Sequence, residues 1–174
     1  MKTIVVSALI LVSGIGLSFK TLTETWMPDN TKYSVKISSS KFEGIFKGLK
    51  TNIHFDETKP EQASIEASIE AETINTGNGL RNKHAKQGIE AAKYPTIRVV
   101  STAISGKGNQ FEFVGKLTIK ETKRELKFLF QFMRLSPSEG LFNGTFTVKP
   151  SDFNIKKSGT PESFIVTLNI PVTK

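Results

Sequence analysis

The sequence contains no cysteine, only two histidines, one tryptophan and two tyrosines. Without cysteine, the chain forms no disulfide, no thiolate metal site, no catalytic thiol and no lipidated N-terminal cysteine. A zinc site takes three or four ligands, most of them cysteine or histidine, so two histidines argue against one. The composition also excludes a collagen, a coiled coil and a multi-span membrane protein. We therefore expect neither a metal nor a cofactor, and a fold that depends on its hydrophobic core.

What the sequence does contain suits one domain, because 174 residues with 37% hydrophobic side chains can build one core. Residues 4–17 form an almost unbroken apolar run behind Lys2, and Ser18 follows it. A positive start, a short apolar run and small residues predict a secretory signal peptide over residues 1–18. An uncleaved anchor is the alternative, although the run is short for a membrane span of about 20 residues. We expect a periplasmic or secreted protein whose single domain covers residues 24–174.

Alternation of apolar and polar residues with a period of two dominates the rest of the chain, as in IEASIEAE at 65–72. Such alternation predicts strands with one dry face, which favours antiparallel pairing. Clusters with glycine or proline separate these segments and predict turns. We expect strands within 31–38, 45–55, 65–72, 96–104, 111–119, 124–133, 142–148 and 164–172. Closing them into an all-β, eight-stranded antiparallel barrel hides the dry face and removes the sheet edges.

Residues 78–93 (NGLRNKHAKQGIEAAK) interrupt the alternation and are rich in alanine, lysine and glutamine. Asn78 is a favourable N-cap, and Tyr94 precedes Pro95, which disfavours helical backbone in the residue before it. We expect one short helix here, inserted between the central strands. Large apolar groups are few on it, so we expect it to pack loosely.

Phenylalanine occurs 13 times, mostly on the face that the alternation turns inward. An eight-stranded barrel is just wide enough to be filled by side chains or to hold one small ligand. Phenylalanine has no polar tip that needs a partner, so a lumen of such residues is dry and accepts a hydrocarbon chain. A packed core and a ligand cavity both stay open here. The predicted lumen residues are Ile45, Leu49, Ile53, Phe111, Phe113, Leu117, Phe128, Phe130, Phe132, Phe142, Phe146 and Phe164.

Four motifs are spread over most of the chain. They are GIFKGL at 44–49, TINTGN at 73–78 with RNKH at 81–84 and KYP at 93–95, GKLTI at 115–119, and DFNI at 152–155. Together they resemble the YceI-like family of periplasmic lipid-binding proteins with a lipocalin-like barrel. The resemblance implies a barrel that holds a polyisoprenoid or a similar long-chain amphiphile, such as an isoprenoid quinone. It also implies a homodimer and no catalytic residues.

The chain departs from the family pattern around the expected helix. Asn82 replaces the usual Asp, Ala85 replaces the usual Leu, and Gly88 and Ile89 stand where a pair of aromatics is usual. Glu121 occupies a position where Gly is common. The helix thus loses bulk, so we expect a wider or looser mouth if it covers the barrel.

Arg81, Asn82, His84 and Tyr94 are the residues that we expect at the barrel mouth. Arg81 and His84 are three positions apart and share a helix face, where they could meet a polar head group. The alternative is structural: His84 bonds a backbone carbonyl and ties the helix to the barrel, and Tyr94 staples the helix end.

The leading hypothesis is a carrier of a long-chain lipid, without catalytic residues. Its basic surface, with a net charge of +8, would make transient contact with an anionic membrane. An enzyme acting on the lipid head group is a second hypothesis, with His84 and Arg81 as its available groups. A filled barrel with a structural or partner-binding role is a third. A nucleic-acid binder would need aromatic side chains among outward lysines, so we expect no nucleic-acid partner.

Overall fold

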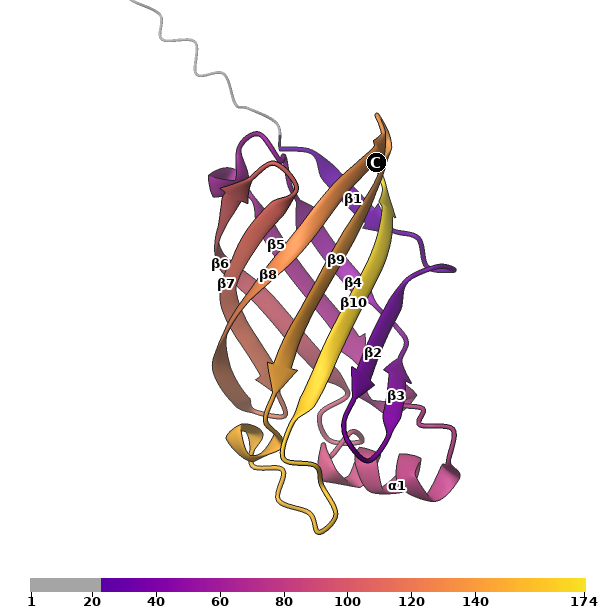
Figure 1. The fold of residues 1–174 in the computed structure, drawn as a ribbon. Helices are drawn as coiled ribbons and strands as arrows, with labels where there is room; N and C mark the ends of the chain where they lie inside the picture. Colours follow the sequence, from indigo (N-terminus) through magenta and orange to yellow (C-terminus); the bar gives the residue numbers. More distant parts are fainter. Residues whose placement is uncertain (1–22) are drawn as a thin grey trace, which may run out of the picture.

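Ten strands form one antiparallel sheet that closes into a barrel in the computed structural model (Figure 1), which describes residues 23–174. The strands are β1 (Thr25–Pro28), β2 (Ser34–Ser38), β3 (Glu43–Phe46), β4 (Lys50–His54), β5 (Ser64–Glu70), β6 (Thr96–Lys107), β7 (Gln110–Ile119), β8 (Thr122–Ser136), β9 (Glu139–Val148) and β10 (Phe164–Thr173). The helical elements are α1 (Gly79–Gly88) and the 3-10 turns η1 (Pro60–Gln62), η2 (Ala71–Thr73) and η3 (Pro150–Phe153).

The ten strands occupy eight positions around the barrel. One end of β10 pairs with β1 at Val172 and Thr173, while the rest of it pairs with β2. In turn β4 pairs with β1, and β3 pairs with β2. Two positions are therefore each filled by two short strands, β1 with β2 and β3 with β4. The predicted eight-stranded antiparallel barrel is confirmed.

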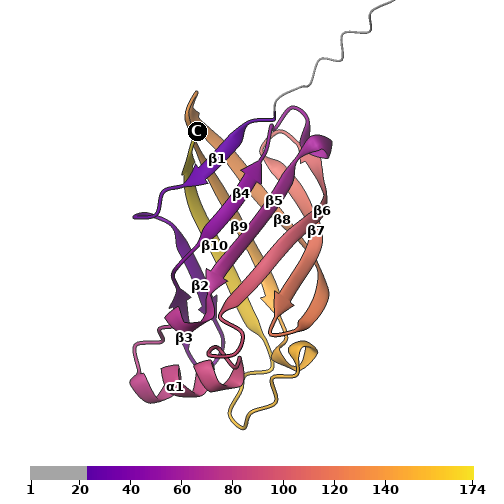
Figure 2. The same cartoon turned by 180° about the vertical axis from the view of Figure 1, so that it is seen from behind.

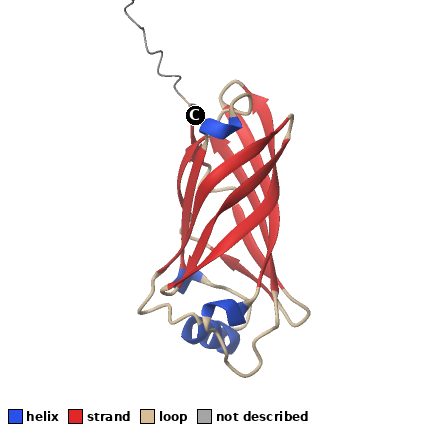
Figure 3. Ribbon diagram, turned by 90° about the vertical axis from the view of Figure 1, so that its left-hand side faces the viewer, coloured by secondary structure: helices blue, strands red, loops and turns tan. Residues whose placement is uncertain are grey.

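The predicted helix is also confirmed, between β5 and β6 in sequence and across one end of the barrel (Figures 1 and 3). Asn78 caps it as predicted, because its side-chain oxygen accepts a hydrogen bond of 2.9 Å from the Arg81 amide. The helix ends at Gly88, and a turn covers the rest of the predicted segment. None of the residues of α1 is buried, which agrees with the loose packing expected from its composition.

The second predicted segment is two strands, β3 and β4, rather than one. Gly48 lies between them with φ of +70°, a left-handed conformation that glycine adopts without steric cost. This break changes which residues face inward, so Phe46 is buried whereas Ile45 is 38% exposed. The prediction that Ile45 lines the lumen is therefore wrong, while Leu49 and Ile53 are buried as predicted.

Two further points concern the N-terminal segment and membrane-spanning helices. The signal peptide predicted for residues 1–18 lies outside the described residues. Within residues 23–174, no helix is long and apolar enough to cross a membrane.

The C-terminus lies at the end of the barrel opposite α1 (Figures 1 and 2). We call the end covered by α1 the open end, and the end at the C-terminus the closed end.

Candidate functional site

An apolar cavity of about 700 Å³ lies inside the barrel and reaches the open end. Its lining comes from β2 to β10, from α1, and from the loop that follows η3. Leu80, Arg81 and His84 of α1 belong to the lining, so the helix lies over the entrance. The volume is in the range of about 300–1,000 Å³ that small-molecule sites occupy.

One row of inward residues on one side of the barrel is small and leaves space inside. Thr51, Ala67 and Val99 lie side by side on β4, β5 and β6 and all line the cavity. The facing strands β8 and β9 carry the larger rings of Phe128 and Phe146, whose centroids are 4.9 Å apart. Native cores are close-packed when side chains meet across them. Here the small row leaves space that the rings do not fill.

The remaining predicted lumen residues divide into two groups. Phe111 and Phe132 are buried, at 1% and 2% exposure, but do not line the cavity, so their predicted place in its wall is wrong. Alternation along a strand shows which face is inside but not how deep a residue lies along the barrel. Nine residues do line the cavity: Leu49, Ile53, Phe113, Leu117, Phe128, Phe130, Phe142, Phe146 and Phe164. That they bind a lipid stays a prediction.

Aromatic rings fill the closed end, and we call Trp26, Phe55, Phe111 and Phe132 the aromatic plug. The Phe55 ring is central, with centroid distances of 5.0 Å to Phe111 and 5.1 Å to Phe132 in edge-on geometry. The indole N–H of Trp26 donates a 3.0 Å hydrogen bond to the carbonyl oxygen of Phe55. Edge-on pairs of this kind stabilise by about 0.5–1.5 kcal/mol beyond their burial. The plug therefore shuts this end of the barrel.

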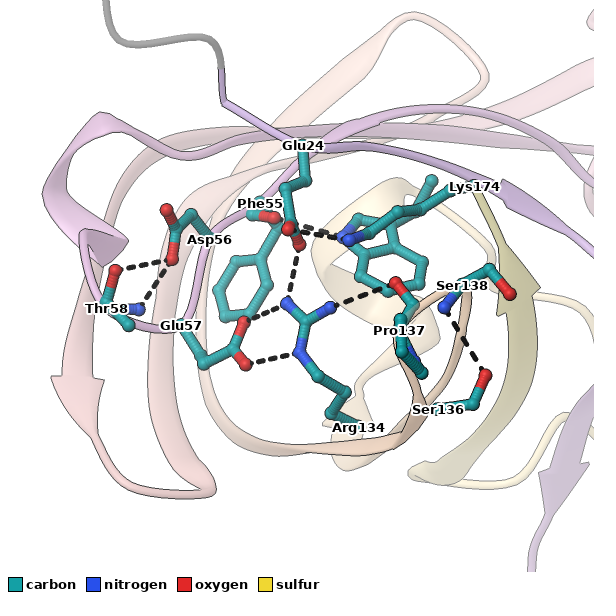
Figure 4. Close-up of polar contacts among 11 residues, drawn as sticks. Glu24, Phe55, Asp56, Glu57, Thr58, Arg134, Ser136, Pro137, Ser138 and Lys174 are labelled. Carbon is teal, nitrogen blue, oxygen red and sulfur yellow. Dashed lines mark hydrogen bonds and ion pairs between the residues drawn. The ribbon is translucent and has the colours of Figure 1, made fainter.

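A charged cluster covers the plug, formed by Glu24, Glu57, Arg134 and Lys174 (Figure 4). The Arg134 guanidinium donates to Glu57 Oε1 and Oε2 at 2.6 Å and to Glu24 Oε2 at 2.5 Å. It also lies 5.2 Å from the Trp26 ring centroid, within the range of a cation–π contact. Lys174 Nζ donates to Glu24 Oε1 at 2.6 Å. The cluster thus ties the start of the described chain to its end.

These contacts lower the pKa of both carboxyl groups. For Glu57 the hydrogen bonds from Arg134 outweigh partial burial, and its pKa falls below the usual value. For Glu24 burial is the largest single influence and opposes ionisation, but Arg134 and Lys174 together overcome it, so its pKa falls too. Both side chains are therefore carboxylates at neutral pH. The sequence reasoning missed this cluster.

The four residues predicted for the mouth have two different roles. Arg81 and His84 line the cavity, and the Arg81 guanidinium lies 5.0 Å from the Phe42 ring centroid. Asn82 does not line the cavity, and its Oδ1 accepts 2.7 Å hydrogen bonds from Thr76 N and Oγ1. This contact ties α1 to the loop before it. The predicted place of Asn82 at the cavity mouth is therefore wrong.

Tyr94 also lies away from the cavity lining, so its predicted place at the mouth is wrong as well. Its hydroxyl donates a 3.2 Å hydrogen bond to Glu121 Oε2, which joins the segment after α1 to the turn between β7 and β8. This is the stapling role given as the alternative. The departure at Glu121 thus supplies the acceptor for the staple.

The entrance of the cavity is basic. Besides Arg81 and His84, Lys41 and Lys157 line it, and no Asp or Glu is found among its described lining residues. Lys157 Nζ donates to Gln87 Oε1 at 2.6 Å, and Lys41 Nζ donates to the Gly159 carbonyl oxygen at 3.3 Å.

The remaining departures from the family pattern lie at the same place. Ala85, Gly88 and Ile89 all belong to the cavity lining. That the missing bulk widens the entrance stays a prediction. Among residues 23–174, no three His, Asp or Glu side chains lie close enough together to hold a metal ion. The described residues also give His84 no hydrogen-bond partner, so no acid–base pair is assembled there.

Comparison with known proteins gives a consistent result. The family model of the YceI-like domain matches residues 25–173. A UPF0312 protein of Pseudomonas syringae pv. tomato is 32% identical over 139 residues, which are 75% of this chain and 72% of that protein.

Two solved structures share the fold. BcnA of Burkholderia cenocepacia aligns with a TM-score of 0.77 and 24% identity, over 85% of this chain and 100% of that one. A polyisoprenoid binding domain from Saccharophagus degradans aligns with a TM-score of 0.70 and 14% identity, over 85% and 97%. At these identities the likeness concerns the barrel itself.

Proposed function

The chain belongs to the YceI-like family, and from this premise we propose that it binds one long-chain isoprenoid lipid or similar amphiphile and carries it outside the cytoplasm. The observation that supports this most is the apolar cavity of about 700 Å³, whose lining at the open end carries basic residues. A solved domain of the same fold is described as polyisoprenoid binding. The cavity argues against the alternative of a filled barrel.

Desolvation supplies the affinity in this proposal. Each CH₂ group that leaves water gains about 0.8 kcal/mol, so a long tail needs few polar contacts. The head group would remain at the entrance, where Arg81, Lys41 and Lys157 offer N–H donors to phosphate, carboxylate or carbonyl oxygens. Discrimination between lipids would then depend on tail length and on the head group. We propose no reaction, because His84 has neither a carboxylate nor a hydroxyl partner among the described residues.

Delivery of the lipid would occur through the open end. Leu80 of α1 is 65% exposed beside the entrance, and Lys83 is exposed on the same helix. An apolar side chain flanked by cations suits transient contact with an anionic membrane surface, at about 1 kcal/mol for each nearby Lys or Arg. The homodimer and the periplasmic or secreted location stay predictions.

The test is native mass spectrometry of the protein purified from its own host, followed by solvent extraction and loading with polyprenols and quinones. Ala67→Phe provides the blocked variant, because a ring at this position enters the cavity beside Thr51 and Val99. Thr145→Phe is its matched control, since the same ring is placed on an exposed position of β9.

We expect a co-purifying long-chain lipid in the wild-type protein and in Thr145→Phe, and its loss in Ala67→Phe. A wild-type protein that stays empty and takes up neither polyprenols nor quinones would contradict the proposal. Equal lipid content in both variants would show that the lipid binds elsewhere on the protein.

A further inference from the structure

Two phenylalanines of the cavity lining also touch the aromatic plug, and we propose that these residues, Phe130 and Phe142, form a floor that limits the length of the bound tail. Both residues line the cavity, and both also contact the aromatic plug. Their ring centroids lie 5.8 Å and 5.4 Å from that of Phe55, the buried centre of the plug. This inference rests on the proposed function and adds a specificity rule to it.

The ring behind the floor is held in place. Phe55 is 0% exposed, its amide donates 2.8 Å to the Glu24 carbonyl oxygen, and its own carbonyl accepts from Trp26 Nε1. Phe142 is also 4.7 Å from Phe132, measured between ring centroids. A tail that reaches the floor therefore meets close-packed rings, and moving them would break contacts throughout the closed end.

The side walls differ from the floor. Phe128 and Phe146 are only half-buried and have the cavity on one side. Phe128 lies against Gly144, where an added Cβ would come within 2.9 Å of the ring. The missing side chain of Gly144 thus makes room for the Phe128 ring at the wall. The walls fix the width of the cavity, and the floor fixes its depth.

A fixed depth predicts a cut-off in chain length. Each added CH₂ that still enters the cavity raises affinity about fourfold, which corresponds to about 0.8 kcal/mol. Once the tail touches the floor, further carbons remain in water and add nothing. A plot of log affinity against chain length should therefore rise and then level off.

The experiment measures this plot with saturated fatty acids from octanoate to eicosanoate, by displacement of the fluorescent probe N-phenyl-1-naphthylamine. Phe142→Ala removes part of the floor, and Phe142→Leu is a milder change if the alanine variant is unstable. Phe146→Ala removes a ring of equal size from the side wall and serves as the matched control.

We expect the cut-off to move to longer acids in Phe142→Ala, by at least one step of the even-numbered series. In Phe146→Ala the affinities fall but the cut-off stays in place. A wild-type plot without a cut-off, or a cut-off that both variants leave unchanged, would contradict the proposal that Phe130 and Phe142 limit the tail length. Neither result would contradict the proposed carrier function. Failure of the wild-type protein to bind any acid, polyprenol or quinone would instead count against the proposed function.

Discussion

The two ends of this barrel differ in packing and in charge. At the closed end, Trp26 and Phe55 are almost completely buried and the charges above them are paired. At the open end, α1 buries none of its residues, and the Arg81 guanidinium at the entrance lies over the Phe42 ring. Close packing stabilises one end, while the other keeps unfilled space. The closed end therefore contributes mainly to the stability of the fold, and the open end provides the space for a ligand.

Among the substitutions considered, removal of Trp26 should lower the free energy of unfolding the most. Trp26→Ala deletes a buried ring together with its hydrogen bond to Phe55, so we expect a loss of about 3–5 kcal/mol in the free energy of unfolding. Leu80→Ala at the open end is the control, with a change within about 0.5 kcal/mol. Urea unfolding followed by circular dichroism measures both. Similar losses in the two variants would contradict the division between the ends.

The charged cluster should have the next largest effect. Arg134→Gln leaves Glu24 and Glu57 without their shared partner, and we expect a loss of about 1–3 kcal/mol in the free energy of unfolding. Arg124→Gln is the control, because the Arg124 side chain is exposed and its one hydrogen bond within residues 23–174 is a 3.4 Å bond to the neighbouring Lys123 carbonyl. Equal stability of the two variants in urea would show that the cluster contributes little.

Acid should weaken the closed end. A carboxyl group whose pKa is lower in the folded state stabilises the fold above its unfolded pKa, and this contribution disappears as the pH falls through the folded pKa. For Glu24 and Glu57 the unfolded value is 4.5. We therefore expect the free energy of unfolding to fall below about pH 4.5, and to fall less steeply in a Glu24→Gln, Glu57→Gln double variant.

Urea titrations at a series of pH values measure this difference. Asp29, whose pKa is lowered to about 2 by hydrogen bonds from Thr31, titrates further down and contributes equally to both proteins. Parallel pH profiles for the wild type and the double variant would show that Glu24 and Glu57 do not contribute to the pH dependence of stability.

The smallest expected effect concerns the attachment of α1. Asn82→Ala removes the acceptor of two hydrogen bonds from Thr76, and we expect a loss of about 1 kcal/mol in the free energy of unfolding. Amide hydrogen exchange should rise in α1 and at Thr76 but not in the closed end. Lys83→Ala, at the exposed neighbouring position, should leave the exchange pattern unchanged. Faster exchange throughout the barrel would show that the open end is not an independent unit.

Much of this fold could be predicted from local sequence. The strands β7, β8 and β10 follow from alternation, and the start of α1 follows from the capping chemistry of Asn78. Each of these signals lies within a few residues of the structure that it predicts. The family motifs added the expectation of a long-chain lipid as the ligand of this barrel.

Other features depend on distant residues and could not be predicted. Strand β1 has four residues, too few to show a period. The break at Gly48 reverses the alternation, which is why Ile45 was placed on the wrong face. Arg134 bonds to Glu57 and Glu24, which are 77 and 110 residues away from it in the sequence. Depth along the barrel, which separates Phe111 from Phe113, is likewise set by packing between strands.

The position of a bound tail tests the central claim most directly. Nuclear magnetic resonance titration with farnesol can follow the Ala67 methyl group in the cavity and the indole N–H of Trp26, the single tryptophan, in the plug. We predict a large shift at Ala67 and at Phe146, with the Trp26 resonance unchanged. A shift at Trp26 with Ala67 unmoved would contradict a hollow open end and a solid closed end.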